Sequence, residues 1–208
     1  MEQVFETDDL RGVLHMPEQA TGDALALTHG AGSDASAPLL VSLSRAFCEA
    51  GMIVLRYDLP FRVAGGSPTS PAAQARDREG VGRAVQALRQ RAKGRVFAGG
   101  HSYGGRQTAM MAAERPDLAD GLLLLSYPLH PPRKPDQPRT GFFPEWRTPG
   151  LFVHGTRDPF GTLEELRGAI QVIPARVDLL VVEGAGHDLK PAARMGGEIL
   201  EMMARMLP

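Results

Sequence analysis

The sequence predicts an α/β fold in which a mostly parallel sheet carries helices on both faces. Short apolar runs such as residues 24–28 and 122–125 show no alternation of polar and apolar positions, which is typical of strands covered on both sides. Stretches with helical spacing of apolar residues separate these runs. Strands that alternate with helices along a chain indicate a mostly parallel sheet.

The expected elements follow in a regular order. A short hairpin around Asp8 and Asp9 opens the chain, with strands at residues 4–7 and 13–16. The further strands are predicted at residues 24–28, 52–55, 96 to 99 or 100, 122–125, 150–154 and 177–182. The predicted helices cover residues 37–50, a long stretch with Val81, Ala84, Val85, Leu88 and Ala92 on one face, residues from about 104 to 115, a short helix from Thr162, and a final helix with Met195, Ile199, Met202, Met203 and Met206 on its apolar face.

Two segments show no clear period. Residues 65–71 are rich in Gly, Pro and Ser and indicate a loop. Residues 126–149 are rich in proline and predict either a long loop or a small lid. Neither segment marks a domain boundary, and there is no repeat of domain size, so residues 1–208 are predicted to form a single domain.

Composition narrows the classes of partner. The 23 Lys and Arg residues balance 24 Asp and Glu residues, for a net charge of -1, which does not favour binding to nucleic acid or to an anionic membrane. The single cysteine, Cys48, suits a reducing compartment. The N-terminus lacks the pattern of a signal peptide, and no apolar run approaches the ~20 residues that span a bilayer. A soluble, cytoplasmic protein is expected.

The most informative motif is Gly-x-Ser-x-Gly at residues 100–104. It follows an apolar strand pattern and precedes a helical one, so Ser102 is predicted to sit on a sharp strand-to-helix turn, the nucleophile elbow. Gly100 and Gly104 lie where side chains would collide across such a turn. The strained backbone exposes the Ser102 hydroxyl at the edge of the sheet.

A serine nucleophile requires a base, and the base requires a carboxylate. Catalytic residues of such folds lie at the carboxyl ends of the parallel strands. Asp158 and His187 each follow the carboxyl end of a later predicted strand. The order Ser102, Asp158, His187 is that of a serine, acid and histidine triad. Asp188 is the competing acid, but neighbours in an extended segment point in opposite directions, so Asp158 is favoured.

Two backbone N–H groups are expected to form an oxyanion hole. Tyr103 N–H lies at the start of the helix after the elbow. Ala31 N–H lies in the glycine-containing loop of residues 29–32, where the backbone can approach a substrate closely.

Arg106 presents two alternatives. It falls in the first turn of the elbow helix, where the helix dipole disfavours a cation. An ion pair with Asp58 that braces the elbow is favoured; the other interpretation is a guanidinium that receives an anionic group of the substrate.

At these residues the chain resembles alpha/beta hydrolases from end to end, which implies an alpha/beta-hydrolase fold with a minimal cap or none. Residues 28–32, 126–130 and 154–161 carry a closer similarity to a small branch related to dienelactone hydrolases. This branch includes the hydrolase-like domains of a testis-expressed protein and of a subunit of a histone-acetyltransferase complex. Dienelactone hydrolases use a cysteine nucleophile, whereas position 102 is serine, so dienelactone itself is not expected as the substrate.

The leading hypothesis is a carboxylesterase-like serine hydrolase that cleaves an ester, thioester or similar acyl bond through an acyl-Ser102 intermediate. Acyl transfer by the same triad and an interaction protein with a vestigial site are the alternatives. No metal-ligand cluster, phosphate loop or dinucleotide motif is present in the sequence, so the expected partner is a small-molecule acyl substrate, without metal or cofactor.

Overall fold

The computed structural model describes residues 1–68 and 70–206. Position 69, within the predicted loop of residues 65–71, and positions 207 and 208 of the predicted domain lie outside the described residues. No helix among the described residues has both the length and the apolar character needed to cross a membrane.

An eight-stranded sheet runs through the centre of the described chain in the order β1-β2-β4-β3-β5-β6-β7-β8. Its strands are β1 (Glu2–Glu6), β2 (Arg11–His15), β3 (Ala24–Thr28), β4 (Ile53–Asp58), β5 (Val96–His101), β6 (Gly121–Leu125), β7 (Gly150–Gly155) and β8 (Val177–Val182). The hairpin of β1 and β2 pairs in antiparallel fashion and joins β4 in the same way. All pairs from β4 to β8 are parallel, so the prediction of a mostly parallel sheet is confirmed.

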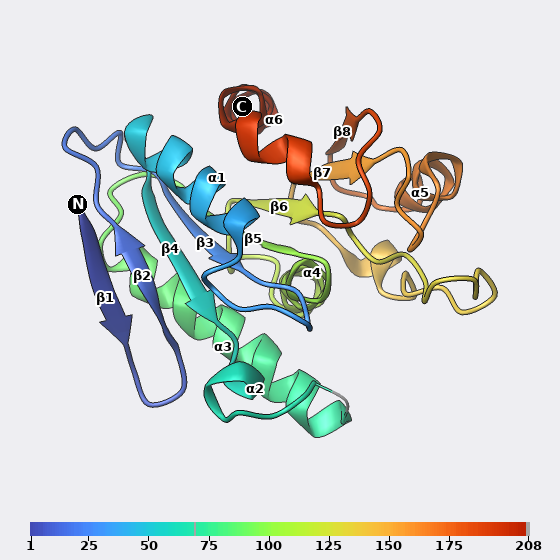
Figure 1. Cartoon of the computed structure of the whole chain (residues 1–208), viewed down its shortest axis with the longest axis horizontal. Helices are drawn as coiled ribbons and strands as arrows, with labels where there is room; N and C mark the ends of the chain where they lie inside the picture. The colour runs from blue at the N-terminus through green and yellow to red at the C-terminus, as the bar shows by residue number, and fades with distance from the viewer. Residues whose placement is uncertain (69, 207–208) are drawn as a thin grey trace.

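Helices cover both faces of this sheet (Figure 1). They are α1 (Pro38–Glu49), α2 (Pro60–Val63), α3 (Pro71–Arg89), α4 (Tyr103–Glu114), α5 (Leu163–Ile170) and α6 (Gly196–Met206), with 3₁₀ helices η1 (Phe143–Glu145) and η2 (Lys190–Arg194). α1 and α6 lie on one face, whereas α3 and α4 lie on the other. The arrangement confirms the predicted fold class.

The central strand β3 shows why the strands lack alternation. Ala24 and Ala26 pack into the core beneath α3 and α4, whereas Leu25 and Leu27 pack into the core beneath α1 and α6. All four side chains are fully buried. A strand with a core on each side needs apolar residues at every position.

The structure adds short elements that the sequence did not indicate and defines the segment of residues 126–149. α2 and η2 each span only four or five residues and were not predicted. The segment after β6 contains one 3₁₀ turn, η1, within irregular backbone. Its Tyr127, Phe143 and Trp146 are fully buried, so it is a long loop anchored in the core.

Candidate active site

The turn between β5 and α4 has the geometry expected of a nucleophile elbow. Ser102 separates the two elements with φ 50° and ψ −115°, a region that costs a non-glycine residue about 1–3 kcal/mol. A Cβ atom on Gly100 would lie 2.7 Å from the carbonyl carbon of Gly104, and one on Gly104 would collide with the carbonyl oxygen of His29. Both glycines are therefore required by close backbone approach.

The structure brings Ser102, His187 and Asp158 together. His187 Nε2 lies 2.7 Å from Ser102 Oγ. His187 Nδ1 lies 3.0 and 2.9 Å from the two carboxylate oxygens of Asp158. A carboxylate accepts, so Nδ1 carries the proton and Nε2 is left to accept the hydrogen of the serine hydroxyl. This is the hydrogen-bonding order of a serine, histidine and acid triad.

Asp158 occupies an environment suited to a permanent anion. Its side chain is fully buried, which by itself raises its pKa. The hydrogen bond from His187 and the bond from the Phe160 N–H at 2.9 Å lower it, and the pKa lies below its usual value in balance. The carboxylate is thus held charged beside the imidazole.

Asp188 is directed elsewhere. Its carboxylate pairs with Lys190 Nζ at 3.0 Å, and its side chain is more than half exposed. The choice of Asp158 over Asp188 as the partner of His187 agrees with this geometry.

The two residues predicted to supply the oxyanion hole, Ala31 and Tyr103, line the same cleft as Ser102. Within the described chain, neither the Ala31 nor the Tyr103 N–H donates a hydrogen bond to another residue. The loop that carries Ala31 is fixed: Gly104 N donates to His29 O at 3.1 Å, and Arg62 Nη2 donates to Ala31 O at 3.1 Å. Both N–H groups are therefore free to receive a ligand oxygen.

These groups open onto a cleft of about 710 Å³. Its size is in the range of pockets that hold small molecules. Besides Ser102 and His187, the cleft is lined by Gly30, Ala31, Gly32, Ser33, Ser67, Pro68, Gln74, His101, Tyr103, Arg106, Pro128, Arg139 and Phe160.

Sequence reasoning missed two residues that position His187. His101 Nε2 contacts His187 O at 2.7 Å, and burial lowers the pKa of His101, which favours the neutral ring that donates this bond. Phe160 stacks on the His187 ring with a centroid separation of 4.0 Å. Both lie near predicted site residues in the sequence: His101 directly precedes Ser102, and Phe160 follows Asp158 by two positions. This proximity was the available signal.

A buried carboxylate on α3 also holds the residue that follows Ser102 in place. Asp77, on α3, accepts hydrogen bonds from Tyr103 Oη at 2.5 Å and from Phe61 N at 2.9 Å. Burial raises the pKa of Asp77 more than these bonds lower it. The pKa of Tyr103 is raised by burial and by the Asp77 carboxylate, so the phenol stays protonated and ties α4 to α3.

The predicted ion pair between Arg106 and Asp58 is wrong. Asp58 instead binds Arg11 Nε at 3.1 Å and Ala35 N at 2.7 Å. The prediction assumed that β4 neighbours the elbow strand, but β3 lies between β4 and β5. Arg106 faces the cleft. Among the described residues, no group of three or more His, Cys, Asp or Glu side chains is placed to hold a metal ion.

Comparison with protein families matches residues 21–207 to the family described as "Alpha/beta hydrolase domain". Among solved structures, Est1E from Butyrivibrio proteoclasticus superposes with a TM-score of 0.76 at 16% identity, covering 99% of this chain and 98% of that one. A dienelactone hydrolase from Anabaena variabilis gives 0.75 at 22% identity, covering 100% and 99%.

A third structure is informative about the cap. XC6422 from Xanthomonas campestris, described as an α/β serine hydrolase without lid, gives a TM-score of 0.74 at 16% identity, covering 100% of this chain and 95% of that one. At such identities the three structures show a shared fold. Since the family match spans nearly the whole sequence, this chain belongs to the alpha/beta hydrolase family.

Proposed function

We propose that the protein is a carboxylesterase-like serine hydrolase that cleaves an ester, thioester or similar acyl bond through an acyl-Ser102 intermediate. The observation that carries the proposal is the continuous hydrogen-bonded series from Ser102 Oγ through His187 to Asp158, open to a cleft. Nothing in the packing of the fold requires these three polar groups to meet.

In the first half of the proposed reaction, Ser102 Oγ attacks the acyl carbon while its proton passes to His187 Nε2. The carbonyl π electrons move onto oxygen, and the resulting oxyanion is stabilised by the N–H groups of Ala31 and Tyr103. Collapse of this intermediate breaks the bond to the leaving group, which takes the proton from His187 Nε2. The product is acyl-Ser102 and an alcohol or thiol.

In the second half, water attacks the acyl carbon and gives a proton to His187 Nε2. The ester bond to Ser102 breaks, Oγ recovers the proton, and a free acid is released. Asp158 stays ionised and stabilises the imidazolium in both halves. All groups used in these steps belong to the chain, and the cleft fits a small-molecule acyl substrate.

Labelling with a fluorophosphonate tests the proposal directly, because the reagent phosphonylates an activated serine. We expect rapid labelling of the folded wild type and none of Ser102→Ala. Ser36→Ala removes a serine outside the cleft and should label like the wild type.

Absence of labelling in folded wild type would contradict the proposal and favour an interaction protein with a vestigial site. Where labelling occurs, the products formed from a 4-nitrophenyl ester in water distinguish hydrolysis from acyl transfer. Hydrolysis releases one equivalent of free acid for each nitrophenol, even when an added alcohol competes.

A further inference from the structure

Two arginines line the cleft beside Ser102. The described residues that line this cleft include Arg106 and Arg139 but neither Asp nor Glu. Neither guanidinium forms an ion pair with a carboxylate in the described part of the chain, and Arg106 Nε is buried there without a hydrogen-bond partner. A buried donor without a partner is unfavourable, so a ligand oxygen that accepts from this nitrogen would stabilise it.

Two neighbouring arginines, unlike Arg106, form ion pairs with carboxylates. Arg78, on the adjoining helix α3, pairs with Glu114 at 3.0 Å, and Arg115, just past the end of α4, pairs with Glu79 at 2.9 Å. Arg106 lies in the first turn of α4, where the helix dipole is unfavourable for a cation. Among the described residues, Arg106 thus differs from Arg78 and Arg115 in having no ion pair, and it lines the cleft.

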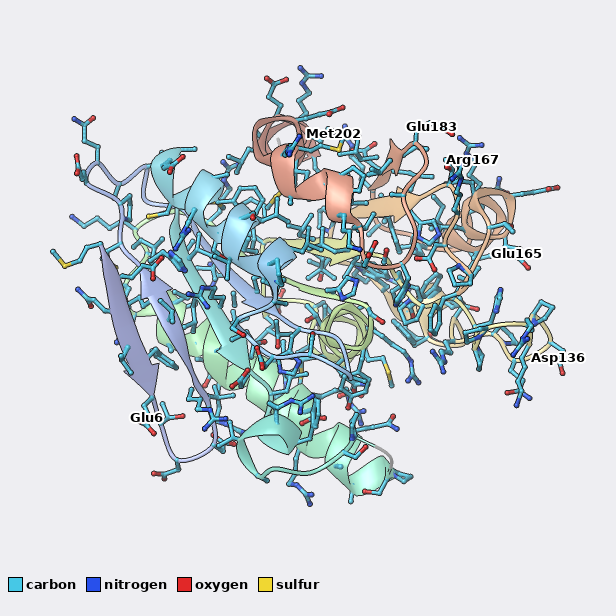
Figure 2. All side chains as sticks on the ribbon, viewed as in Figure 1. Glu6, Asp136, Glu165, Arg167, Glu183 and Met202 are labelled. Carbon is cyan, nitrogen blue, oxygen red and sulfur yellow. The ribbon has the colours of Figure 1, made fainter. Side chains whose placement is uncertain are left out.

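Arg139 comes to the cleft from the loop between β6 and β7, and its backbone is fixed there. Its N–H donates to Leu129 O at 2.8 Å, and its carbonyl accepts from Tyr127 Oη at 2.6 Å. Asp136 marks the outer end of this loop, away from the sheet (Figure 2). Burial and the nearby charge of Arg106 lower the pKa of Arg139. The two like charges thus repel each other, and both residues line the cleft.

The inference drawn from these observations rests on the proposed hydrolase function and concerns the class of ester that the protein cleaves. We propose that Arg106 and Arg139 together bind an anionic group, a carboxylate or a phosphate, on the ester that Ser102 attacks. The anion neutralises two repelling cations and supplies an acceptor for the buried Nε of Arg106. Guanidinium groups are well suited to this because they bind carboxylate and phosphate oxygens through paired N–H donors.

Helix geometry places the backbone of Arg106 close to that of Ser102. Arg106 follows Ser102 by four residues, and its N–H donates to Ser102 O at 3.0 Å. Positions four apart lie on one face of a helix, about 6 Å apart along the axis. The fully extended acyl chain of a six-carbon dicarboxylic acid spans a similar length, which makes adipate half-esters suitable probes.

The test compares matched esters. One pair is 4-nitrophenyl hydrogen adipate and its methyl-capped neutral form, with the anion in the acyl part; the other is 4-acetoxybenzoate and its methyl ester, with the anion in the alcohol part. We expect kcat/KM of the wild type to favour the anionic member of at least one pair by tenfold or more. High salt should reduce this preference.

The arginine variants assign the preference to the two side chains. In Arg106→Gln and in Arg139→Gln, the anionic-to-neutral ratio of kcat/KM should fall by tenfold or more, and Arg139→Lys should keep part of it. Arg133→Gln, in the same loop but outside the cleft, should keep the wild-type ratio. Competitive inhibition by adipate but not by inorganic phosphate assigns a carboxylate; inhibition by phosphate as well assigns a less selective anion site.

Failure of this inference is distinct from failure of the hydrolase proposal. Turnover of the neutral esters without any preference for the anionic ones would overturn the anion site and leave the hydrolase intact. If no ester is turned over, calorimetric titration with adipate and with phosphate decides the matter on wild type and on both Gln variants. Binding of either anion that both variants lose supports the site, and absence of binding by the wild type overturns it.

Discussion

The pair Asp158 and Asp188 offers a test at the scale of single residues. Asp158→Asn removes the anion that orients His187 and stabilises the imidazolium, so kcat for a neutral aryl ester should fall by ~10⁴-fold. Asp188→Asn removes only an exposed ion pair with Lys190 and should cost less than about tenfold. Ester hydrolysis by the two purified variants, with thermal unfolding as the folding control, provides the measurement. The opposite ranking would show that Asp188 is the acid.

The sequence predicted those residues of the site that belong to a short motif or that directly follow a strand. Ser102 follows from the elbow motif, and Asp158 and His187 follow from their places after two strands. The partner of Arg106 could not be predicted in this way, because it depended on which strand lies beside β5. His101 and Phe160 act through a backbone carbonyl and a stacked ring, contacts that leave no motif in the sequence.

At the scale of elements, the elbow depends on the close contact between α4 and the loop after β3. Gly104→Ala places a Cβ against the carbonyl oxygen of His29, where backbone must move on both sides. We expect the free energy of unfolding to fall by ~1–3 kcal/mol, as for other overpacked sites, together with loss of ester hydrolysis.

Gly168→Ala is the matched control. This glycine also lies inside a helix, α5, but nothing stands within 4 Å of its added Cβ. The substitution should raise the free energy of unfolding by about 0.5–1 kcal/mol, because alanine favours the helix. Urea unfolding of both variants measures the difference. A Gly104→Ala protein as stable as the wild type would show that the elbow tolerates a side chain.

Elements were predicted best where the local signal is long or chemically specific. The helix expected at residues 37–50 is α1, Pro38–Glu49. The capping box at Thr162 is present, with Thr162 Oγ1 accepting from Glu165 N and the Glu165 carboxylate accepting from Thr162 N. α2 and η2 span too few residues for a period to emerge, and their formation depends on packing against neighbouring elements.

At the scale of the whole molecule, the loop after β6 determines whether the cleft has a movable cap. The sequence left two alternatives for residues 126–149, a long loop or a small lid, because proline-rich segments carry no period. In the structure, Phe143 is fully buried and packs edge-on against Trp146 and Phe152, the latter on β7. The loop therefore packs into the same hydrophobic core as the sheet. This anchoring holds Arg139 at the cleft.

Truncation of Phe143 separates these alternatives. If the loop is part of the core, Phe143→Ala should lower the free energy of global unfolding by ~3–5 kcal/mol, as is usual for a buried phenylalanine. Val172→Ala, at a position 54% exposed, should change it by less than about 0.5 kcal/mol. A lid that opens independently would give a different result: a small change in global stability, with faster amide hydrogen exchange confined to residues 126–149. Urea unfolding combined with native-state hydrogen exchange measures both quantities in the same variant, because a loop that unfolds only with the sheet must exchange at the global rate.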